Sequence, residues 1–219
     1  MSKFFPEKIT ILSASELQEQ FHEELILEDE IPVNLETIGG VTSYSRGSII
    51  KVAMSILKIK DNYSNFEILK QDFVEDTSRI PELPTFGGFR EGRVIADTIT
   101  SFDIPDILMI KGHGLNHPRK FGIACHVGLS MNIATIAVST ELLCGEVKTI
   151  DGKNLIMDDE EIVGEVVKKT ATSPRLYVSP GHRVSVETAA EIVRKTTLEK
   201  IPEPLRIANE ELVKRMSQK

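Results

Sequence analysis

The stretch DILMIKGHGLNHPRKFGIACHVGL, residues 106–129, places a buried strand, a polar loop and a helix one after another. The apolar run Ile107 to Ile110 lies between a proline and a glycine, a pattern typical of a strand buried on both faces. The loop from Lys111 to Lys120 holds two glycines, two histidines, a proline and three cations. The periodic apolar segment Ile123 to Leu129 then predicts a helix. Because sites in open α/β sheets lie at the carboxyl ends of strands, this loop is the first candidate for a functional site.

The composition indicates an ordinary globular protein with no overall attraction to nucleic acid. The 219 residues are 41% hydrophobic and 27% charged, which suits one well-packed α/β domain. The 33 acidic residues outnumber the 26 basic ones and give a formal charge of −7, so phosphate binding requires a local basic patch. We expect a single domain over residues 1–219, with an N-terminal helix and link at 1–32 and the core with a C-terminal helix at 33–219.

The cysteines and the N-terminus favour a cytoplasmic location. Cys125 and Cys144 lie in apolar surroundings without CxxC or Cys/His metal spacing. The N-terminus lacks the apolar core of a signal peptide, and the longest apolar run is shorter than a membrane span. These patterns predict a soluble protein with reduced thiols and no membrane partner.

Upstream of residue 106 the sequence predicts a helix, three antiparallel strands and a second helix. Ser15 and Gln18 form a candidate capping box for the first helix. Turn-type residues separate three β-like segments, which favours a meander, and the loop at 79–88 holds two prolines and two glycines. The expected helices span residues 15–27 and 90–102, and the expected strands span 36–45, 48–59 and 66–74.

Downstream of residue 129 the sequence predicts three more strands and two helices. Turns are expected at 141–145 and at 179–182, where the second turn opens a helix. Hairpin-linked strands followed by alternating strands and helices predict an α/β protein with a mixed sheet and helices on its faces. The expected strands span residues 134–138, 160–168 and 175–178, and the expected helices span 186–195 and 203–216.

Five short motifs carry a resemblance to a known family. They are FREG (89–92), GHGLNHPRK (112–120), GIACHVGL (122–129), SPGHR (179–183) and IPEP (201–204). Together, and in this order, they resemble the endonuclease V family over residues 35–208. The resemblance implies an RNase H-like mixed sheet of five or more strands flanked by helices. It also implies cleavage of DNA or RNA, of the DNA-repair type, on the 3′ side of deaminated adenine (inosine or deoxyinosine), with Mg²⁺ or Mn²⁺ as cofactor.

The resemblance also implies which positions carry the catalytic chemistry, and this chain departs from the family pattern at three of them. Glu91 stands at the family's helical glutamate, and His182 stands at the histidine of the SPGH turn. Thr42 and Lys111 stand where the family has two aspartates that hold the metal ion. Thr140 stands where the family has a lysine.

These departures predict a degraded metal site in which only Glu91 is a residual metal ligand. A hard divalent ion prefers oxygen ligands, and Lys111 replaces one of them with a cation. An ammonium about 4 Å from a divalent ion costs roughly 8 kcal/mol at an effective dielectric of about 20. Binding a metal at millimolar to micromolar affinity is worth only about 4 to 8 kcal/mol. We therefore expect Lys111 to occupy the metal position as a buried ion pair with Glu91, which leaves cleavage weak or lost.

The binding surface, in contrast, is expected to survive. The resemblance implies a pocket for a flipped base, built largely from backbone groups of the Pro-rich loop and the GHG loop, while the basic and imidazole side chains of the second loop meet phosphates. Glu82 replaces a tyrosine that wedges nucleic-acid strands apart, and it repels phosphates and cannot stack on a base. The residues assigned to nucleic-acid or base contacts are Glu82, Leu83, Thr85, Gly87, Gly112, His113, His117, Arg119, Lys120 and Ile123.

Simpler interpretations stay open for several of these residues. Glu91 can be a first-turn carboxylate placed for the helix dipole, and His182 can be a turn residue bonded to backbone. Lys111 can be a solvated strand end. Arg119 with Lys120 can be a basic patch that serves only solubility.

Three functions therefore remain. The first is an endonuclease V-like protein that binds inosine-containing or distorted DNA or RNA with weak or no cleavage. The second is an active Mg²⁺- or Mn²⁺-dependent endonuclease V that cuts 3′ of deoxyinosine. The third is a non-enzymatic scaffold for a protein partner, which the absence of any nucleic-acid binding at low salt would favour.

Overall fold

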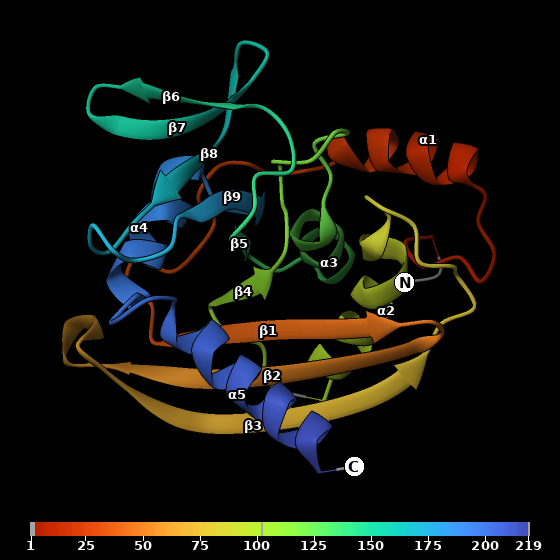
Figure 1. The fold of residues 1–219 in the computed structure, drawn as a ribbon, viewed down its shortest axis with the longest axis horizontal. Coiled ribbons are helices and arrows are strands. Elements are labelled where there is room, and N and C mark those ends of the chain that lie inside the picture. Colours follow the sequence, from red (N-terminus) through yellow and green to blue (C-terminus); the bar gives the residue numbers. More distant parts are fainter. Residues whose placement is uncertain (1–2, 102, 219) are drawn as a thin grey trace.

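The computed structural model describes residues 3–101 and 103–218, and within these residues nine strands form one mixed sheet (Figure 1). The strand order is β3-β2-β1-β4-β5-β9-β8-β7-β6. The strands are β1 (Thr37–Arg46), β2 (Ile49–Lys60), β3 (Asn65–Thr77), β4 (Ile107–Lys111), β5 (Thr135–Ser139), β6 (Glu146–Ile150), β7 (Lys153–Asp158), β8 (Glu161–Val167) and β9 (Leu176–His182). The helices are α1 (Ile11–His22), α2 (Gly87–Ile99), α3 (Ile123–Met131), α4 (Val186–Thr196) and α5 (Glu203–Ser217), with a 3₁₀ turn η1 (Asp61–Tyr63). The expected α/β mixed sheet is confirmed.

Three strands at the centre of the sheet run parallel, and their carboxyl ends meet at one edge. Val41 of β1 lies opposite Ile110 of β4, and Lys111 lies opposite Val138 of β5. The remaining neighbouring strands are antiparallel. The loop after β4, which the sequence singles out, therefore leaves the sheet at the edge shared by the three strand ends.

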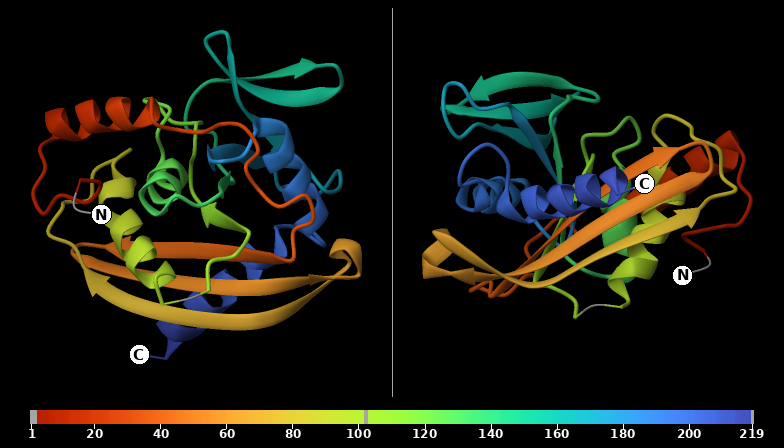
Figure 2. Two further views of the ribbon diagram at one scale, coloured as in Figure 1. Left: turned by 180° about the vertical axis from the view of Figure 1, so that it is seen from behind. Right: turned by 60° about the horizontal axis from the view of Figure 1, so that its bottom comes forward.

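Helices cover both faces of the sheet, and strand alternation assigns each side chain to one face. On one face α2 and α3 pack over a cluster that includes Leu108 and Ile110 of β4. On the other face α4 and α5 pack over a cluster that includes Ile107 and Met109. Figures 1 and 2 show α5 crossing β1 to β3 on the face opposite α2.

A glycine lets α5 approach β1 closely. A Cβ on Gly40 would overlap the carbonyl oxygen of Pro204, at the start of α5. The same oxygen accepts a hydrogen bond of 2.8 Å from the Ser55 hydroxyl of β2. This close contact sits two residues before Thr42 and sets the position of α5 against the sheet.

Helix α1 lies outside the sheet and packs on the side of α2 and α3 through aromatic residues. The ring of Phe21 lies 4.9 Å from that of Phe4 and 5.7 Å from that of Phe121, centroid to centroid. His126 is fully buried among these rings, and its Nε2–H donates to the Phe4 carbonyl at 2.8 Å. The aromatic cluster thereby ties the N-terminal segment to the loop that precedes α3.

The structure corrects two sequence predictions and adds a hairpin that was not predicted. The first helix begins at Ile11, capped by the Thr10 hydroxyl, and Gln18 is buried instead of serving a capping box. Residues 179–182 continue strand β9 and do not form a turn. The hairpin of β6 and β7 was not predicted, although its Asp151-Gly152 turn, with both φ angles positive, is a recognised hairpin signal.

Candidate functional site

The carboxyl ends of the central strands bring Thr42 and Lys111 next to each other. Val41 of β1 and Ile110 of β4 lie opposite each other in the sheet, and Thr42 and Lys111 are the residues that follow them. Thr42 is 1% exposed, and its hydroxyl has no hydrogen-bond partner among the described residues. Lys111 is exposed. The strand ends therefore present one buried hydroxyl and one solvated cation.

Glu91 lies on α2 and has an arginine as its charged neighbour. Its side chain is only 12% exposed, and its Oε1 lies 3.6 Å from Nε of Arg90. The other carboxylate oxygen is buried without a hydrogen-bond partner in the part of the chain described here. Arg90 itself is 3% exposed and donates from Nη2 to the Gly47 carbonyl. Glu91 is thus a partly unsatisfied carboxylate beside a buried guanidinium.

The predicted buried ion pair between Lys111 and Glu91 is wrong. Lys111 shares its strand face with Ile107 and Met109, whereas α2 packs on the opposite face. Arg90 is the cation that accompanies Glu91, and Lys111 leaves the sheet toward solvent. Strand alternation, which the sequence already contained, separates the two side chains.

The residues at the strand ends do not fit the divalent ion that the family resemblance implies. Within residues 3–101 and 103–218, no three His, Cys, Asp or Glu side chains gather where they could hold a metal ion. Glu91 supplies one carboxylate, Thr42 supplies a neutral hydroxyl and Lys111 adds positive charge. A hard divalent ion needs several oxygen ligands, preferably charged ones.

A cavity of about 170 Å³, here called the glycine pocket, adjoins the strand ends. Its walls come from two segments far apart in the sequence, the Pro-rich loop with the start of α2 and the loop between β4 and α3. Thr85, Gly87, Gly112 and Ile123, which the resemblance assigns to base recognition, all line it. The full lining is Thr85, Gly87, Gly88, Gly112, His113, His117, Gly122, Ile123 and Leu143.

Small residues are a steric requirement of this pocket. Gly112 has φ +150°, and a Cβ there would lie 2.7 Å from Cγ2 of Ile123. A Cβ on Gly122 would overlap the carbonyl oxygen of His113. The pocket therefore presents backbone atoms to whatever occupies it.

Most of the side chains predicted to contact phosphates instead form hydrogen bonds or ion pairs within the protein. The Nε2–H of His117 donates to the Thr85 carbonyl at 2.9 Å, and its Nδ1 accepts from the Arg119 amide at 3.2 Å. Arg119 donates to the Thr85 hydroxyl at 2.6 Å and stacks over Phe86 at 4.5 Å. Lys120 pairs with Glu161. His113, which is half-buried, has its pKa lowered by burial.

A second hollow of about 550 Å³ lies beside the glycine pocket and shares Thr85 and Gly87 with it. Glu82 and Leu83, both predicted to contact nucleic acid, line this hollow together with Glu91. Glu82 is exposed, so its charge faces any ligand that approaches Glu91. The remaining lining residues are Pro84 and Arg90.

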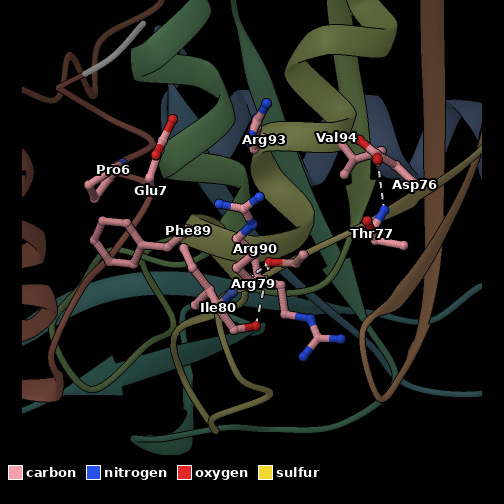
Figure 3. A pocket seen from close by; sticks show the side chains of 11 residues that line it. Pro6, Glu7, Asp76, Thr77, Arg79, Ile80, Phe89, Arg90, Arg93 and Val94 are labelled. Atoms are coloured by element: carbon pink, nitrogen blue, oxygen red, sulfur yellow. Dashed lines mark hydrogen bonds between the residues drawn. The ribbon is translucent and has the colours of Figure 1, made fainter.

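Arg90 also lines a third hollow, of about 280 Å³, on its other side (Figure 3). Figure 3 shows Arg90 and Arg93 of α2 beside Phe89, with Glu7 and Asp76 nearby. None of the residues predicted from the sequence to act in the site lines this hollow. It holds charges of both signs.

His182 does not join the site. It lies opposite Thr135, three residues before the Val138 that pairs with Lys111, which is roughly 10 Å along β5. Its ring is 1% exposed, and its Nδ1 accepts a hydrogen bond of 3.2 Å from the Ile26 amide. His182 therefore anchors the segment after α1, and the simpler interpretation as a backbone-bonded residue is the one the structure supports.

Sequence reasoning missed three lining residues of the glycine pocket. Gly122 stood inside a motif and Gly88 stood in the expected loop 79–88, and their steric roles could have been suspected there. Leu143, which is 39% exposed, belongs to the loop after β5. Nothing in the sequence links Leu143 to the pocket, because the contact depends on how that loop folds back.

Buried neutral histidines predict an acid-sensitive fold. Burial lowers the pKa of His117 and of His126 from 6.5 to about 4. Their stabilising contribution is complete above pH 6.5 and is lost as the pH falls through about 4, because protonation then favours the unfolded chain. We expect the free energy of unfolding to fall by about 3 kcal/mol or more over this interval, measured by urea unfolding at a series of pH values. His126→Phe should reduce the pH dependence, and an equal slope in this variant would contradict the prediction.

The fold and the site together define an RNase H-like α/β protein with a backbone-lined pocket at the carboxyl ends of its parallel strands. The endonuclease V family model matches residues 19–210. The endonuclease V of Ignicoccus hospitalis is 34% identical over 194 residues, covering 88% of this chain and 89% of that protein. The chain belongs to the endonuclease V family.

Solved structures agree with this fold. Human ENDOV superposes with a TM-score of 0.86 at 20% identity, covering 95% of this chain and 99% of that one. Ciona intestinalis endonuclease V, solved with a 24mer DNA containing an inosine followed by a ribo-adenosine, gives a TM-score of 0.82 at 21% identity, covering 95% of this chain and 98% of that one. None of the helices described is both long enough and apolar enough to cross a bilayer.

Proposed function

We propose that this protein binds DNA or RNA containing deaminated adenine (inosine or deoxyinosine), and that its cleavage of the strand is weak or lost. The proposal rests on two features of the structure that lie side by side. The glycine pocket, which suits recognition of a planar base by main-chain groups, lies beside strand ends that carry Thr42 and Lys111 in place of metal-binding carboxylates. Binding and cleavage depend on different atoms, so one can persist without the other.

The glycine pocket supports the binding half of the proposal. Its volume of about 170 Å³ is on the scale of one base, and its two loops present backbone groups to the interior. Recognition of a flipped base through hydrogen bonds to its edge needs few particular side chains. The relative from Ciona intestinalis has an inosine-containing DNA bound in its structure.

The residues at the strand ends support the second half of the proposal, that cleavage is weak or lost. A nuclease of this kind must offset charge at the scissile phosphate and activate a water molecule. Here Glu91 is the one carboxylate of the family set, and Arg90 already lies beside it. One carboxylate beside an arginine supplies fewer oxygen ligands than a divalent ion prefers, which supports weak or lost cleavage.

A cleavage and binding assay tests the proposal. The purified protein is incubated with a deoxyinosine oligonucleotide and an inosine RNA, each with a matched adenosine control, in Mg²⁺ or Mn²⁺. The expected result is preferential binding of the inosine strands with little or no product. Equal affinity for inosine and adenosine strands would refute the binding half, and multiple turnover would refute the loss of cleavage.

The exposure of Lys111 favours a second candidate, an active Mg²⁺- or Mn²⁺-dependent enzyme that cuts 3′ of deoxyinosine. A solvated lysine can turn away from a ligand, whereas a buried ion pair cannot. The same assay separates the two candidates, because only the second predicts product that accumulates with time.

Glu82 offers a direct test of the approach path to the pocket. Its exposed carboxylate lines the hollow shared with Glu91, where it repels a phosphate backbone. Glu82→Gln should raise the affinity for a single strand about threefold at low salt, with the gain shrinking as salt screens the charge. Fluorescence anisotropy at two salt concentrations measures this effect. Glu199→Gln, at an exposed glutamate between α4 and α5, is the matched control, and an equal gain in both variants would reject a local effect of Glu82.

A further inference from the structure

Gln18 of α1 is a buried amide whose polar atoms are all engaged. It is 1% exposed and lies immediately before the residues that match the family, 19–210. Its Nε2 donates to the Thr85 carbonyl and to the Phe121 carbonyl, both at 3.0 Å. Its Oε1 accepts from Nε of Arg119 at 2.6 Å. One side chain therefore joins the Pro-rich loop to the loop before α3.

These two loops are the opposing walls of the glycine pocket. Thr85 lies on the first wall, while Phe121 directly precedes Gly122 and Ile123 on the second. One NH₂ group thus donates to a carbonyl on each wall and bridges them. His117 and Arg119 of the second loop also bond to Thr85, and Gln18 is the bridging side chain that comes from α1.

The conformation of Thr85 needs this support. Its φ of +71° lies in the left-handed region, which is unfavourable for a β-branched residue. Its carbonyl accepts hydrogen bonds from Gln18 and His117, and its hydroxyl accepts one from Arg119. A strained backbone conformation persists where several surrounding contacts hold it in place, and the hydrogen bond from Gln18 of α1 is one of these contacts.

We propose that Gln18 is a positioning residue for purine recognition, setting the width of the glycine pocket so that it accepts a flat hypoxanthine base. The inference rests on the proposed function, since it concerns the same pocket. It assigns to α1, a helix outside the sheet, a part in selecting the ligand. Gln18 acts through Thr85 and Phe121 and does not itself line the pocket.

Two variants of Gln18 and one control test this role. Gln18→Met keeps the length of the side chain and removes all three hydrogen bonds. Gln18→Glu keeps the shape and the acceptor for Arg119, but it places a carboxylate against two carbonyls. Gln20→Met, at an exposed glutamine on the same helix, is the matched control.

Two measurements on the folded proteins are needed. Hydrogen exchange in the ligand-free protein reports the rigidity of residues 83–88 and 121–123. Dissociation constants for inosine and adenosine strands give a discrimination ratio. We expect both Gln18 variants to exchange at least tenfold faster in these segments and to lose about tenfold in discrimination, with no change in Gln20→Met. Gln18→Met and Arg119→Met should also be non-additive in the discrimination ratio, because they remove one network.

The outcomes separate this inference from the proposed function. Exchange in the Gln18 variants equal to that in Gln20→Met would overturn the positioning role. A lower melting temperature with an unchanged discrimination ratio would also overturn it, since that is the mark of a merely structural residue. If the unmodified protein shows no preference for inosine, the proposed function fails, and the exchange measurement alone then decides whether Gln18 positions the walls.

Discussion

Replacing both Thr42 and Lys111 by aspartate is expected to create a Mn²⁺ site with a dissociation constant on the order of micromolar to millimolar, where the natural chain binds Mn²⁺ much more weakly. Two carboxylates then lie side by side at the ends of β1 and β4, and the positive charge of Lys111 is removed. Binding at such affinities is worth about 4 to 8 kcal/mol, and charged oxygen ligands supply the attraction that the natural chain lacks there. Isothermal titration calorimetry with Mn²⁺ measures the gain.

The same double variant should be less stable without metal. Thr42 is buried, so an aspartate there carries an uncompensated charge into the fold until a cation arrives. Mn²⁺ should therefore raise its melting temperature far more than that of the natural chain. Thr42→Asp alone keeps the Lys111 cation and is the matched control. Equal heat of binding in this single variant would place the ion away from Lys111, and no heat of binding in the folded double variant would contradict the prediction.

Gly40→Ala is expected to lower the free energy of unfolding by about 3 kcal/mol, the upper range for overpacking. The added methyl would overlap the carbonyl oxygen of Pro204, a backbone atom held by the Ser55 hydroxyl, so the start of α5 must move away from β1. Urea unfolding measures the loss.

Gly47→Ala provides the contrast for this prediction. Gly47 lies in the turn between β1 and β2 with φ +59°, and no atom lies within 4 Å of the position that an added methyl would take. Its replacement should cost about 1 kcal/mol, from the left-handed backbone alone. A cost for Gly40→Ala no larger than this would mean that α5 adjusts freely and that its position does not depend on the glycine.

Much of the sheet could be predicted from local pattern. The meander of β1 to β3 and the buried runs of β4 and β5 follow from alternation and from apolar runs between breakers. The end of β9 escaped prediction because Ser179-Pro180-Gly181-His182 consists of turn-forming residues. Pairing with β5, interrupted by a register shift at Thr135 and Ile136, holds it extended. Tertiary pairing overrode local preference there.

The site was predictable where it depends on motifs and unpredictable where it depends on tertiary contacts. The loops with Gly87 and Gly112 were found from their resemblance to the family, and they do line one pocket. The ion pair of Lys111 with Glu91 failed because it ignored which face of β4 each partner occupies. The capping role predicted for Gln18 failed because its hydrogen bonds reach loops 67 and 103 residues away, a separation that no local pattern encodes.

The tight glycine contacts limit which substitutions this protein can accept during evolution. At Gly40 and Gly122 any side chain would collide with a carbonyl oxygen of another segment, so loss of either glycine threatens folding before it touches catalysis. Purifying selection for a folded protein is then enough to preserve the recognisable frame, whether or not the protein cuts nucleic acid. A preserved scaffold therefore shows that the protein folds, and evidence about its chemistry must come from the residues at the strand ends.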